Sequence, residues 1–154
     1  MTIALGSAVP DFTLPTDGGA TLTLSALQGR AVVLYFYPKD DTSGCTAEAC
    51  AFQESLPDFT GIDAVIVGVS KDSPARHDRF KAKYGLTFPL VSDEEGALCE
   101  AFGVWVEKSM YGRTYFGIER STFLIDAQGV LRREWRKVKV TGHAKEVLAA
   151  VQAL

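Results

Sequence analysis

The chain has 154 residues, of which 47% are hydrophobic and 23% charged, which fits one globular domain and argues against a disordered chain. Its formal net charge of −3 gives no basic excess that would attract nucleic acid or an anionic membrane. It contains no apolar run of about 18 residues, so we expect no membrane span, and the N-terminus lacks the basic start of a secretory signal. We therefore predict one domain over residues 1–154 whose partner is a small molecule or another protein.

The number of cysteines bears on the compartment. The chain has three cysteines, and an odd number does not suit a secreted scaffold held by disulfides. We therefore expect a cytoplasmic protein. In a reducing cytosol a cysteine is more often catalytic, redox-active or part of the core than half of a structural disulfide.

Four extended segments are predicted in the first half of the chain. Residues 11–14 and 20–24 flank Gly18-Gly19, which is typical of a turn, so we expect an N-terminal β-hairpin. Residues 31–37 and 64–69 are continuous runs of apolar, β-prone side chains. Strands without polar alternation are usually covered on both faces, as in a parallel sheet with helices above and below.

Two helices are predicted beside these strands. Residues 45–56 are rich in Ala and Glu, and Pro57 marks the expected end of that helix. Residues 73–84 form the second helix, with Ser73 as its N-cap and Gly85 as its stop.

The second half of the chain alternates shorter elements. In chain order we expect a strand at 90–91, a helix at 95–102, strands at 121–125 and 130–136, and an amphipathic helix at 143–154. Residues 111–115 are typical of a mobile loop that flanks a pocket, and His77 and His143 lie near no motif and are expected at the surface. This order predicts an α/β fold with a central mixed β-sheet flanked by helices. Functional groups in such folds gather beyond the carboxyl ends of the strands.

The segment after the strand at 31–37 contains the residues with the most reactive chemistry. Cys45 falls in the first turn of the predicted helix, where unpaired amides and the helix dipole favour an anionic sulfur. The hydroxyl of Thr42 could donate a hydrogen bond to the thiolate, and a nearby guanidinium could stabilise it further. The alternative is that Cys45 is a small buried hydrophobic residue. The Gly-Cys pair that opens a helix after a polar loop favours the reactive thiol.

Cys45 and Cys50 cannot form a disulfide within a regular helix. Five helical residues separate the two Cα atoms by roughly 8.6 Å, whereas a disulfide needs them within about 7 Å. Either the two cysteines never pair, or the start of the helix unwinds when they do. The spacing is not the C-x-x-C of disulfide oxidoreductases, nor the repeated close pairs of a zinc site, so we expect no metal.

A basic group of side chains surrounds the last predicted strand. It could bind nucleic acid or an acidic partner, but a charged edge that prevents strand pairing is the favoured interpretation. Its members are Arg132, Arg133, Arg136, Lys137 and Lys139.

The motifs together resemble the peroxiredoxins. Pro38-x-x-x-Thr42-x-x-Cys45 matches their active-site signature, and Cys50 resembles the resolving cysteine of the Q subgroup, the bacterioferritin-comigratory type. The similarity covers nearly the whole chain, and it includes Gly6-x-x-x-Pro10-Asp-Phe12-x-Leu14, Val69-Ser-Lys-Asp72, Phe102-Gly-Val-Trp105 and Arg120-Ser-Thr-Phe-Leu-Ile-Asp126.

The resemblance implies a thioredoxin-like fold and the reduction of hydrogen peroxide and organic hydroperoxides by sulfur alone, without a cofactor. It assigns Cys45 as the peroxidatic cysteine, which becomes a sulfenic acid, and Cys50 as the resolving cysteine of an intramolecular disulfide. Thr42 and Arg120 match the residues that hydrogen-bond the thiolate and the peroxide, and Pro38 matches the residue that shields the pocket. Thioredoxin is the implied reductant, and the subgroup is often monomeric.

Two alternatives accompany this assignment. Glu48, three residues after Cys45, either pairs with Arg120 and orients it or is an ordinary solvent-facing carboxylate. The cysteine pair could also serve a non-enzymatic redox sensor or holdase, whose thiol would oxidise no faster than a free one. Cys99 is expected in the core or to be mildly oxidisable.

Overall fold

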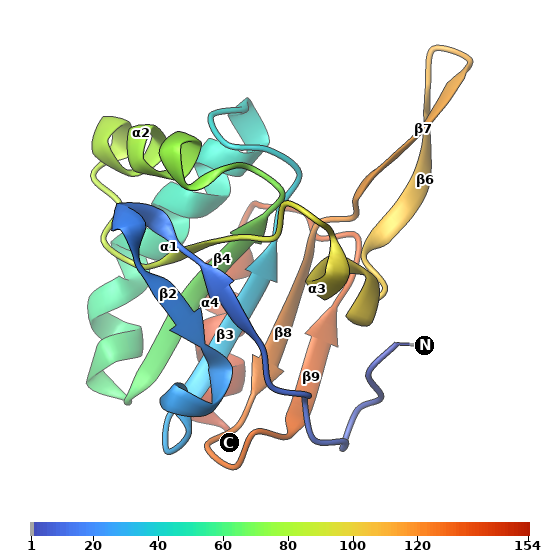
Figure 1. Cartoon of the computed structure of the whole chain (residues 1–154). Coiled ribbons are helices and arrows are strands. Elements are labelled where there is room, and N and C mark those ends of the chain that lie inside the picture. The colour runs from blue at the N-terminus through green and yellow to red at the C-terminus, as the bar shows by residue number, and fades with distance from the viewer. Residues whose placement is uncertain (1) are drawn as a thin grey trace.

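A central sheet of five strands, in the order β5-β4-β3-β8-β9, organises the computed structural model, which describes residues 2–154 (Figure 1). The strands β3 (Ala31–Phe36), β4 (Ala64–Ser70) and β5 (Leu90–Ser92) are parallel. The strands β8 (Ser121–Ile125) and β9 (Leu131–Trp135) run antiparallel to their neighbours. The predicted mixed sheet is therefore confirmed.

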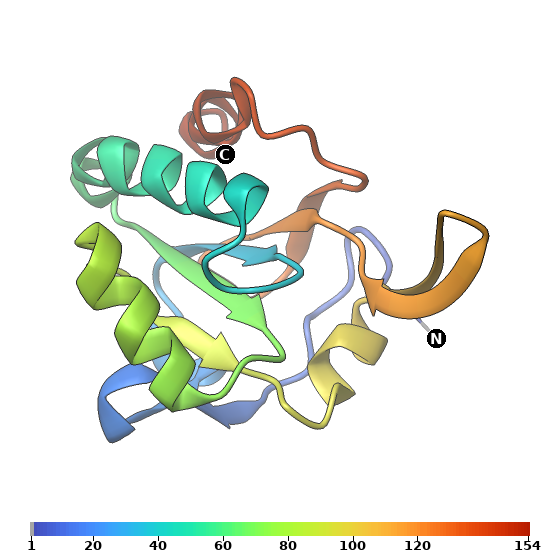
Figure 2. The same cartoon turned by 90° about the horizontal axis from the view of Figure 1, so that it is seen from above.

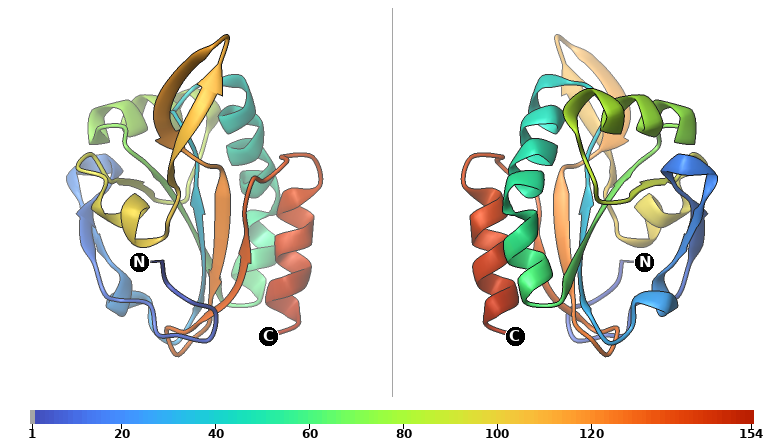
Figure 3. Two further views of the ribbon diagram at one scale, coloured as in Figure 1. Left: turned by 90° about the vertical axis from the view of Figure 1, so that its right-hand side faces the viewer. Right: turned by 90° about the vertical axis from the view of Figure 1, so that its left-hand side faces the viewer.

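Helices cover both faces of this sheet. The helices α1 (Ser43–Gly61) and α4 (His143–Gln152) lie side by side on one face (Figures 2 and 3). The short helix α3 (Ala97–Ala101) lies on the opposite face with the N-terminal hairpin, whose strands are β1 (Thr13–Pro15) and β2 (Thr21–Thr23). The helix α2 (Pro74–Tyr84) packs beside β5 at the sheet edge. Within residues 2–154, no helix has the length and apolar character needed to cross a membrane.

The continuous apolar run of β3 is explained by its position in the middle of the sheet. Val33 and Tyr35 point into the core under α1 and α4, while Val32, Leu34 and Phe36 point into the core on the opposite face. Successive side chains of a strand point to opposite faces, so a strand covered on both sides must be apolar at every position. Burial on this scale holds β3 in place and fixes where the loop after it begins.

Most predicted element boundaries lie close to the observed ones, with one clear exception. Ser73 caps α2 by accepting a hydrogen bond from the amide of Arg76 at 3.3 Å, and Gly85 ends it with a left-handed φ of 66°. However, α1 starts two residues earlier than predicted and continues through Pro57 to Gly61. The proline removes one hydrogen bond of the helix, but burial of Phe59 anchors the last turn against the sheet.

The predicted loop at 111–115 is wrong, because this stretch belongs to a second hairpin. The strands β6 (Trp105–Met110) and β7 (Arg113–Ile118) pair along their whole length and project from the body of the molecule (Figures 1 and 2). Tyr111 and Gly112 connect them with φ values of 53° and 77°. Two positive φ angles are typical of the two-residue turn that joins tightly paired strands.

The prediction that His77 and His143 lie at the surface is also wrong. His77 is fully buried and His143 is 5% exposed. Each imidazole is held by hydrogen bonds to groups far away in the sequence: His77 contacts Asp40 and the Val91 carbonyl, and His143 contacts Thr122. A polar side chain with such partners can enter a core without a large cost.

Candidate active site

The candidate site lies at the carboxyl end of β3, where two distant segments of the chain meet. The loop that leaves β3 turns into α1, so Cys45 becomes the third residue of that helix. Antiparallel pairing of β3 with β8 sets Phe36 opposite Ser121. Arg120, which precedes Ser121, is therefore delivered to the same end of the sheet as the start of α1.

Arg120 bridges Cys45 and Glu48 with its two terminal nitrogens. One nitrogen donates a hydrogen bond to the Cys45 sulfur at 3.4 Å, and the other donates to Oε1 of Glu48 at 2.7 Å. Cys45 is 2% exposed and Glu48 is 1% exposed. The expected Glu48–Arg120 pair is thus present, and Glu48 is not a solvent-facing carboxylate. A planar guanidinium suits this arrangement, because its donors form a fixed fork.

Gly44 provides the space for this approach. A Cβ atom at Gly44 would lie 3.1 Å from a terminal nitrogen of Arg120, which is closer than a side chain normally permits. The Gly-Cys pair of the sequence therefore has a steric reason: the residue before the thiol must leave room for the guanidinium.

The electrostatics of the site follow from burial of opposite charges. Burial raises the pKa of Glu48 from 4.5 to about 7, although the charge and hydrogen bond of Arg120 act in the opposite direction. Burial alone would lower the pKa of Arg120, but Glu48 and Cys45 outweigh that effect and raise it. Arg120 is therefore a permanent cation beside the sulfur, whereas Glu48 can exist in either protonation state near neutral pH.

Thr42 lies at the N-cap of α1, but its hydroxyl does not point to the sulfur. The hydroxyl donates a hydrogen bond to the Lys39 carbonyl at 2.9 Å, so the expected hydrogen bond to Cys45 is not formed in this conformation. The reason is local, because the tight loop brings a carbonyl three residues earlier within reach. Pro38 lies at the start of the same loop and is partly exposed.

The three cysteines are free and lie in different environments. Cys45 and Cys99 are buried, while Cys50 is exposed on α1. Burial and a hydrogen bond to Asp93 raise the pKa of Cys99. Cys99 is therefore a poor nucleophile, and Cys50 is the accessible thiol near Cys45 in the chain.

Sequence reasoning missed a buried network under the loop that leads to Cys45. Asp40 accepts hydrogen bonds from the Tyr37 hydroxyl at 2.5 Å and contacts Nδ1 of His77 at 2.6 Å. The other ring nitrogen of His77 faces the Val91 carbonyl at 3.1 Å. Since both nitrogens face acceptors, one proton lies between Asp40 and His77 and a second lies on Nε2. The amide of Asp40 also donates to Asp72 at 2.8 Å.

The second hairpin contributes a further cation to the neighbourhood. Lys108 donates from its ammonium to the Ile118 carbonyl at 2.5 Å, and its stem lies over Gly117. Burial, followed by the charge of Arg120, lowers the pKa of Lys108. The Tyr111-Gly112 pair was the sequence signal that could have located this hairpin.

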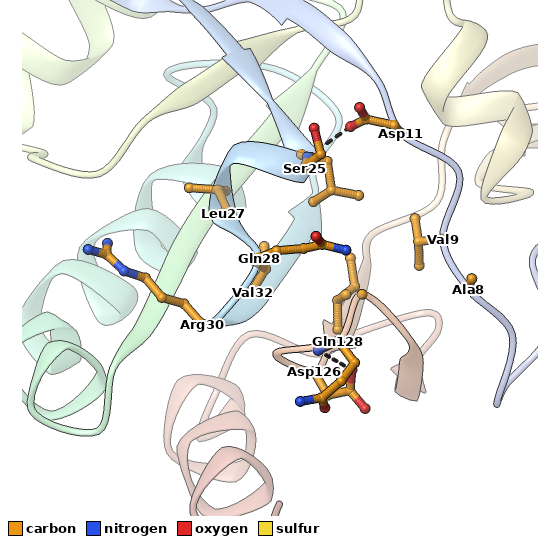
Figure 4. A pocket seen from close by; sticks show the side chains of 13 residues that line it. Ala8, Val9, Asp11, Ser25, Leu27, Gln28, Arg30, Val32, Asp126 and Gln128 are labelled. Atoms are coloured by element: carbon orange, nitrogen blue, oxygen red, sulfur yellow. Dashed lines mark hydrogen bonds between the residues drawn. The ribbon is translucent and has the colours of Figure 1, made fainter.

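The cavity shown in Figure 4 is not part of this site. It has a volume of about 100 Å³ and is lined by residues including Asp11, Gln28 and Gln128. It lies by Val32 at the start of β3, whereas Cys45 follows the end of that strand. In the described part of the chain, residues 2–154, no group of three or more His, Cys, Asp or Glu side chains is arranged to hold a metal ion.

The site combines a buried sulfur with a guanidinium at the start of a helix on a thioredoxin-like fold. This combination is typical of a class of thiol enzymes. Comparison with known proteins identifies the family. The AhpC/TSA family model matches residues 5–134. The chain is 53% identical over 152 residues to peroxiredoxin Bcp of Bacillus subtilis, which covers 99% of this chain and 97% of that protein.

Two solved structures are similar over nearly the whole chain. A mutant of the peroxiredoxin PrxQ from Xylella fastidiosa superposes with a TM-score of 0.94 at 46% identity, covering 98% of this chain and 96% of that one. The Xanthomonas campestris bacterioferritin comigratory protein, studied for alkyl peroxide reduction, gives a TM-score of 0.88 at 53% identity, covering 92% and 90%.

The chain belongs to the AhpC/TSA family. Within it, the chain is a peroxiredoxin of the Q subgroup, and it is a thiol-dependent peroxidase.

Proposed function

We propose that Cys45 is the peroxidatic cysteine of this peroxidase and that Arg120 activates it. The observation that carries the proposal is the 3.4 Å hydrogen bond from the guanidinium of Arg120 to the sulfur. The unpaired amides of the first turn of α1 add positive potential at the same point. A sulfur held in this way is favoured as the thiolate, which is the nucleophilic form.

The proposed reaction begins with in-line attack of the sulfur on the peroxide. The Cys45 thiolate forms an S–O bond as the O–O bond breaks, and negative charge moves to the leaving oxygen. Arg120 stabilises that charge with donors that are already in place. The Thr42 hydroxyl donates to the Lys39 carbonyl, so its lone pairs remain free to accept a hydrogen bond from the peroxide. Pro38 borders the loop and limits access of water.

Cys50 is the proposed resolving cysteine. After the first step Cys45 is a sulfenic acid, and the exposed thiol of Cys50 attacks it to give a disulfide and water. Two Cα atoms about 8.6 Å apart in a regular helix must first approach, so the start of α1 has to unwind. A dithiol protein of the thioredoxin type then reduces the disulfide.

The remaining features of the proposal concern substrate, assembly and compartment. Organic hydroperoxides are included beside hydrogen peroxide, since the similar Xanthomonas campestris protein was studied for alkyl peroxide reduction. The proposed compartment is the cytoplasm, because three free cysteines suit a reducing environment. The proposed assembly is a monomer.

The role of Cys45 is tested by Cys45→Ser, with Cys99→Ser as the matched control. We expect Cys45→Ser to abolish thioredoxin-dependent consumption of peroxide, while Cys99→Ser, at a buried position outside the site, retains it. Peroxidase activity that survives in Cys45→Ser would reject the assignment.

The role of Cys50 is tested by separating the two half-reactions. Cys50→Ser should still reduce one equivalent of peroxide, observed as a sulfenic acid trapped with dimedone, but should not turn over with thioredoxin. Normal turnover of Cys50→Ser would show that another thiol resolves the intermediate.

A further inference from the structure

Among residues 2–154, the two buried acids of the site contact one cation, Arg120, whose side chain is 17% exposed. Cys45 and Glu48 are 2% and 1% exposed, and both contact the guanidinium of Arg120. If the sulfur and the carboxylate were ionised together, two buried anions would share one cation. Such an excess charge in a desolvated site is costly, and the usual escape is that one group keeps its proton.

The surroundings of Glu48 favour the carboxyl as the group that keeps it. Only Oε1 has a partner; Oε2 is buried and has no hydrogen-bond partner among the described residues. A buried carboxylate oxygen without a donor loses its hydration without compensation. The Tyr35 hydroxyl from β3 is likewise buried without a partner, and it supplies no charge to offset an anion. Burial accordingly raises the pKa of Glu48 to about 7.

Among residues 2–154, no other charged group forms a direct contact with Cys45 or Glu48 that would supply a second counter-ion. Lys108 of β6 bonds a backbone carbonyl and is partly exposed to solvent. His143 of α4 is buried against Thr122, and burial lowers its pKa, which favours the neutral imidazole. Asp40, in the loop before α1, is paired with His77, and this pair offers no cation to the site. The balance around Arg120 therefore depends on Cys45 and Glu48.

We propose that Cys45 and Glu48 share one proton against the single guanidinium of Arg120, so that Glu48 holds the thiol proton while the sulfur is a thiolate and releases it when the sulfur is oxidised. This inference rests on the proposed role of Cys45. Glu48 is then more than an orienting partner of Arg120, and it links the ionisation of the thiol to the protonation of the leaving group.

The proton and electron balance of the cycle closes within the site. The Cys45 thiol passes its proton to the Glu48 carboxylate, giving a thiolate and a neutral carboxyl. The thiolate donates an electron pair to the terminal peroxide oxygen, the O–O bond breaks, and an alkoxide leaves. Sulfur is oxidised to the sulfenic acid and the peroxide is reduced. Loss of the thiolate charge lets Glu48 ionise, and its proton is the one that converts the alkoxide to an alcohol.

The test measures protons released when Cys45 is alkylated by iodoacetamide, a reaction that requires no peroxidase activity. It is carried out at pH 8 in weak buffer with a pH indicator, on the chain with Cys50→Ser and Cys99→Ser. Alkylation removes the thiolate charge that keeps Glu48 protonated. Without that charge the pKa of Glu48 is about 7, so at pH 8 the carboxyl should ionise. We therefore expect about one proton to be released per Cys45. The same chain with Glu48→Gln should release almost none.

Glu54→Gln is the matched control, because Glu54 is an exposed carboxylate on the same helix. It should release the same proton as the parent chain. Equal release by the Glu48→Gln chain and its parent would overturn the proposal. Retained peroxidase activity in Cys45→Ser would instead overturn the role of Cys45, so the two failures are distinguishable.

Two further measurements separate this role from a structural one. Oxidation of Cys45 by peroxide should slow in the parent chain only at pH values above 8, where Glu48 loses the proton that it holds beside the thiolate. Glu48→Gln should lack that alkaline limb, with a rate about 10² lower at neutral pH. If Glu48→Gln does not fold, infrared spectra at pH 8 provide the answer. A protonated carboxyl should be present in the parent chain and absent in Cys45→Ser; the same spectrum in both would refute the shared proton.

Discussion

Unwinding of the start of α1 makes a quantitative prediction for Ala47→Gly. Ala47 lies between the two cysteines and is exposed, so its methyl group contributes helix propensity rather than core packing. Replacing it with glycine should destabilise this part of the helix by about 1 kcal/mol. If unwinding precedes attack by Cys50, the unwound population and the rate of disulfide formation should both increase about fivefold.

The structure explains why the stability of the start of α1 should limit the rate of disulfide formation. Unwinding must withdraw Cys45 and Ala49 from the core, where they are 2% and 1% exposed, and must break the 2.7 Å contact between Glu48 and Arg120. The unwound state is therefore a minor one, and its population limits the step.

The assay oxidises the reduced protein with one equivalent of peroxide and follows the disulfide by rapid alkylation and mass analysis. Glu54→Gly is the control, because it loosens an exposed position of α1 beyond Cys50, where no unwinding is required. A rate of disulfide formation that Ala47→Gly leaves unchanged, or that Glu54→Gly raises equally, would refute the reasoning.

Three other predictions follow from the buried charges. Because burial raises the pKa of Glu48 from 4.5 to about 7, the folded state binds more protons than the unfolded state between these pH values, and stability falls as pH rises through them. In a Cys45→Ser chain, the free energy of unfolding in urea should fall by about 2–3 kcal/mol between pH 5 and pH 8 relative to the same chain with Glu48→Gln; parallel curves would contradict this. His77→Gln should cost about 3–5 kcal/mol of unfolding free energy by leaving Asp40 buried without its partner, and adding Asp40→Asn should recover part of that loss; no recovery would argue against a charged pair. Arg120→Lys keeps a positive charge but cannot reach both Glu48 and the sulfur with a fixed fork, so stopped-flow oxidation of Cys45 should slow about 10²–10³-fold, and an unchanged rate constant would show that charge alone is sufficient.

The sequence alone was sufficient for the elements that depend on local chemistry. The apolar runs of β3 and β4 predict strands of a sheet covered on both faces, and the N-cap Ser73 and the stop Gly85 define α2. The sequence also predicted correctly that Cys45 lies in the first turn of a helix. These signals come from residues that are neighbours in the chain, whose preferences act before any distant contact forms.

Other features depend on contacts between residues far apart in the sequence. Arg120 reaches the sulfur of a residue 75 positions away, and the register of β3 against β8 sets that distance. His77 has the sequence context of a polar surface helix, yet Asp40, 37 positions away, provides the partner that allows its burial.

The amino-acid sequence by itself therefore determined the buried strands of the central sheet, the ends of α2 and the position of Cys45 at the start of a helix, because each follows from residue type and spacing. Tertiary structure alone decided the protonation chemistry of Glu48 and the direction of the Thr42 hydroxyl. Burial and the position of a hydrogen-bond partner are properties of the packed chain. The residue type alone does not say whether a carboxylate is surrounded by water or held against Arg120.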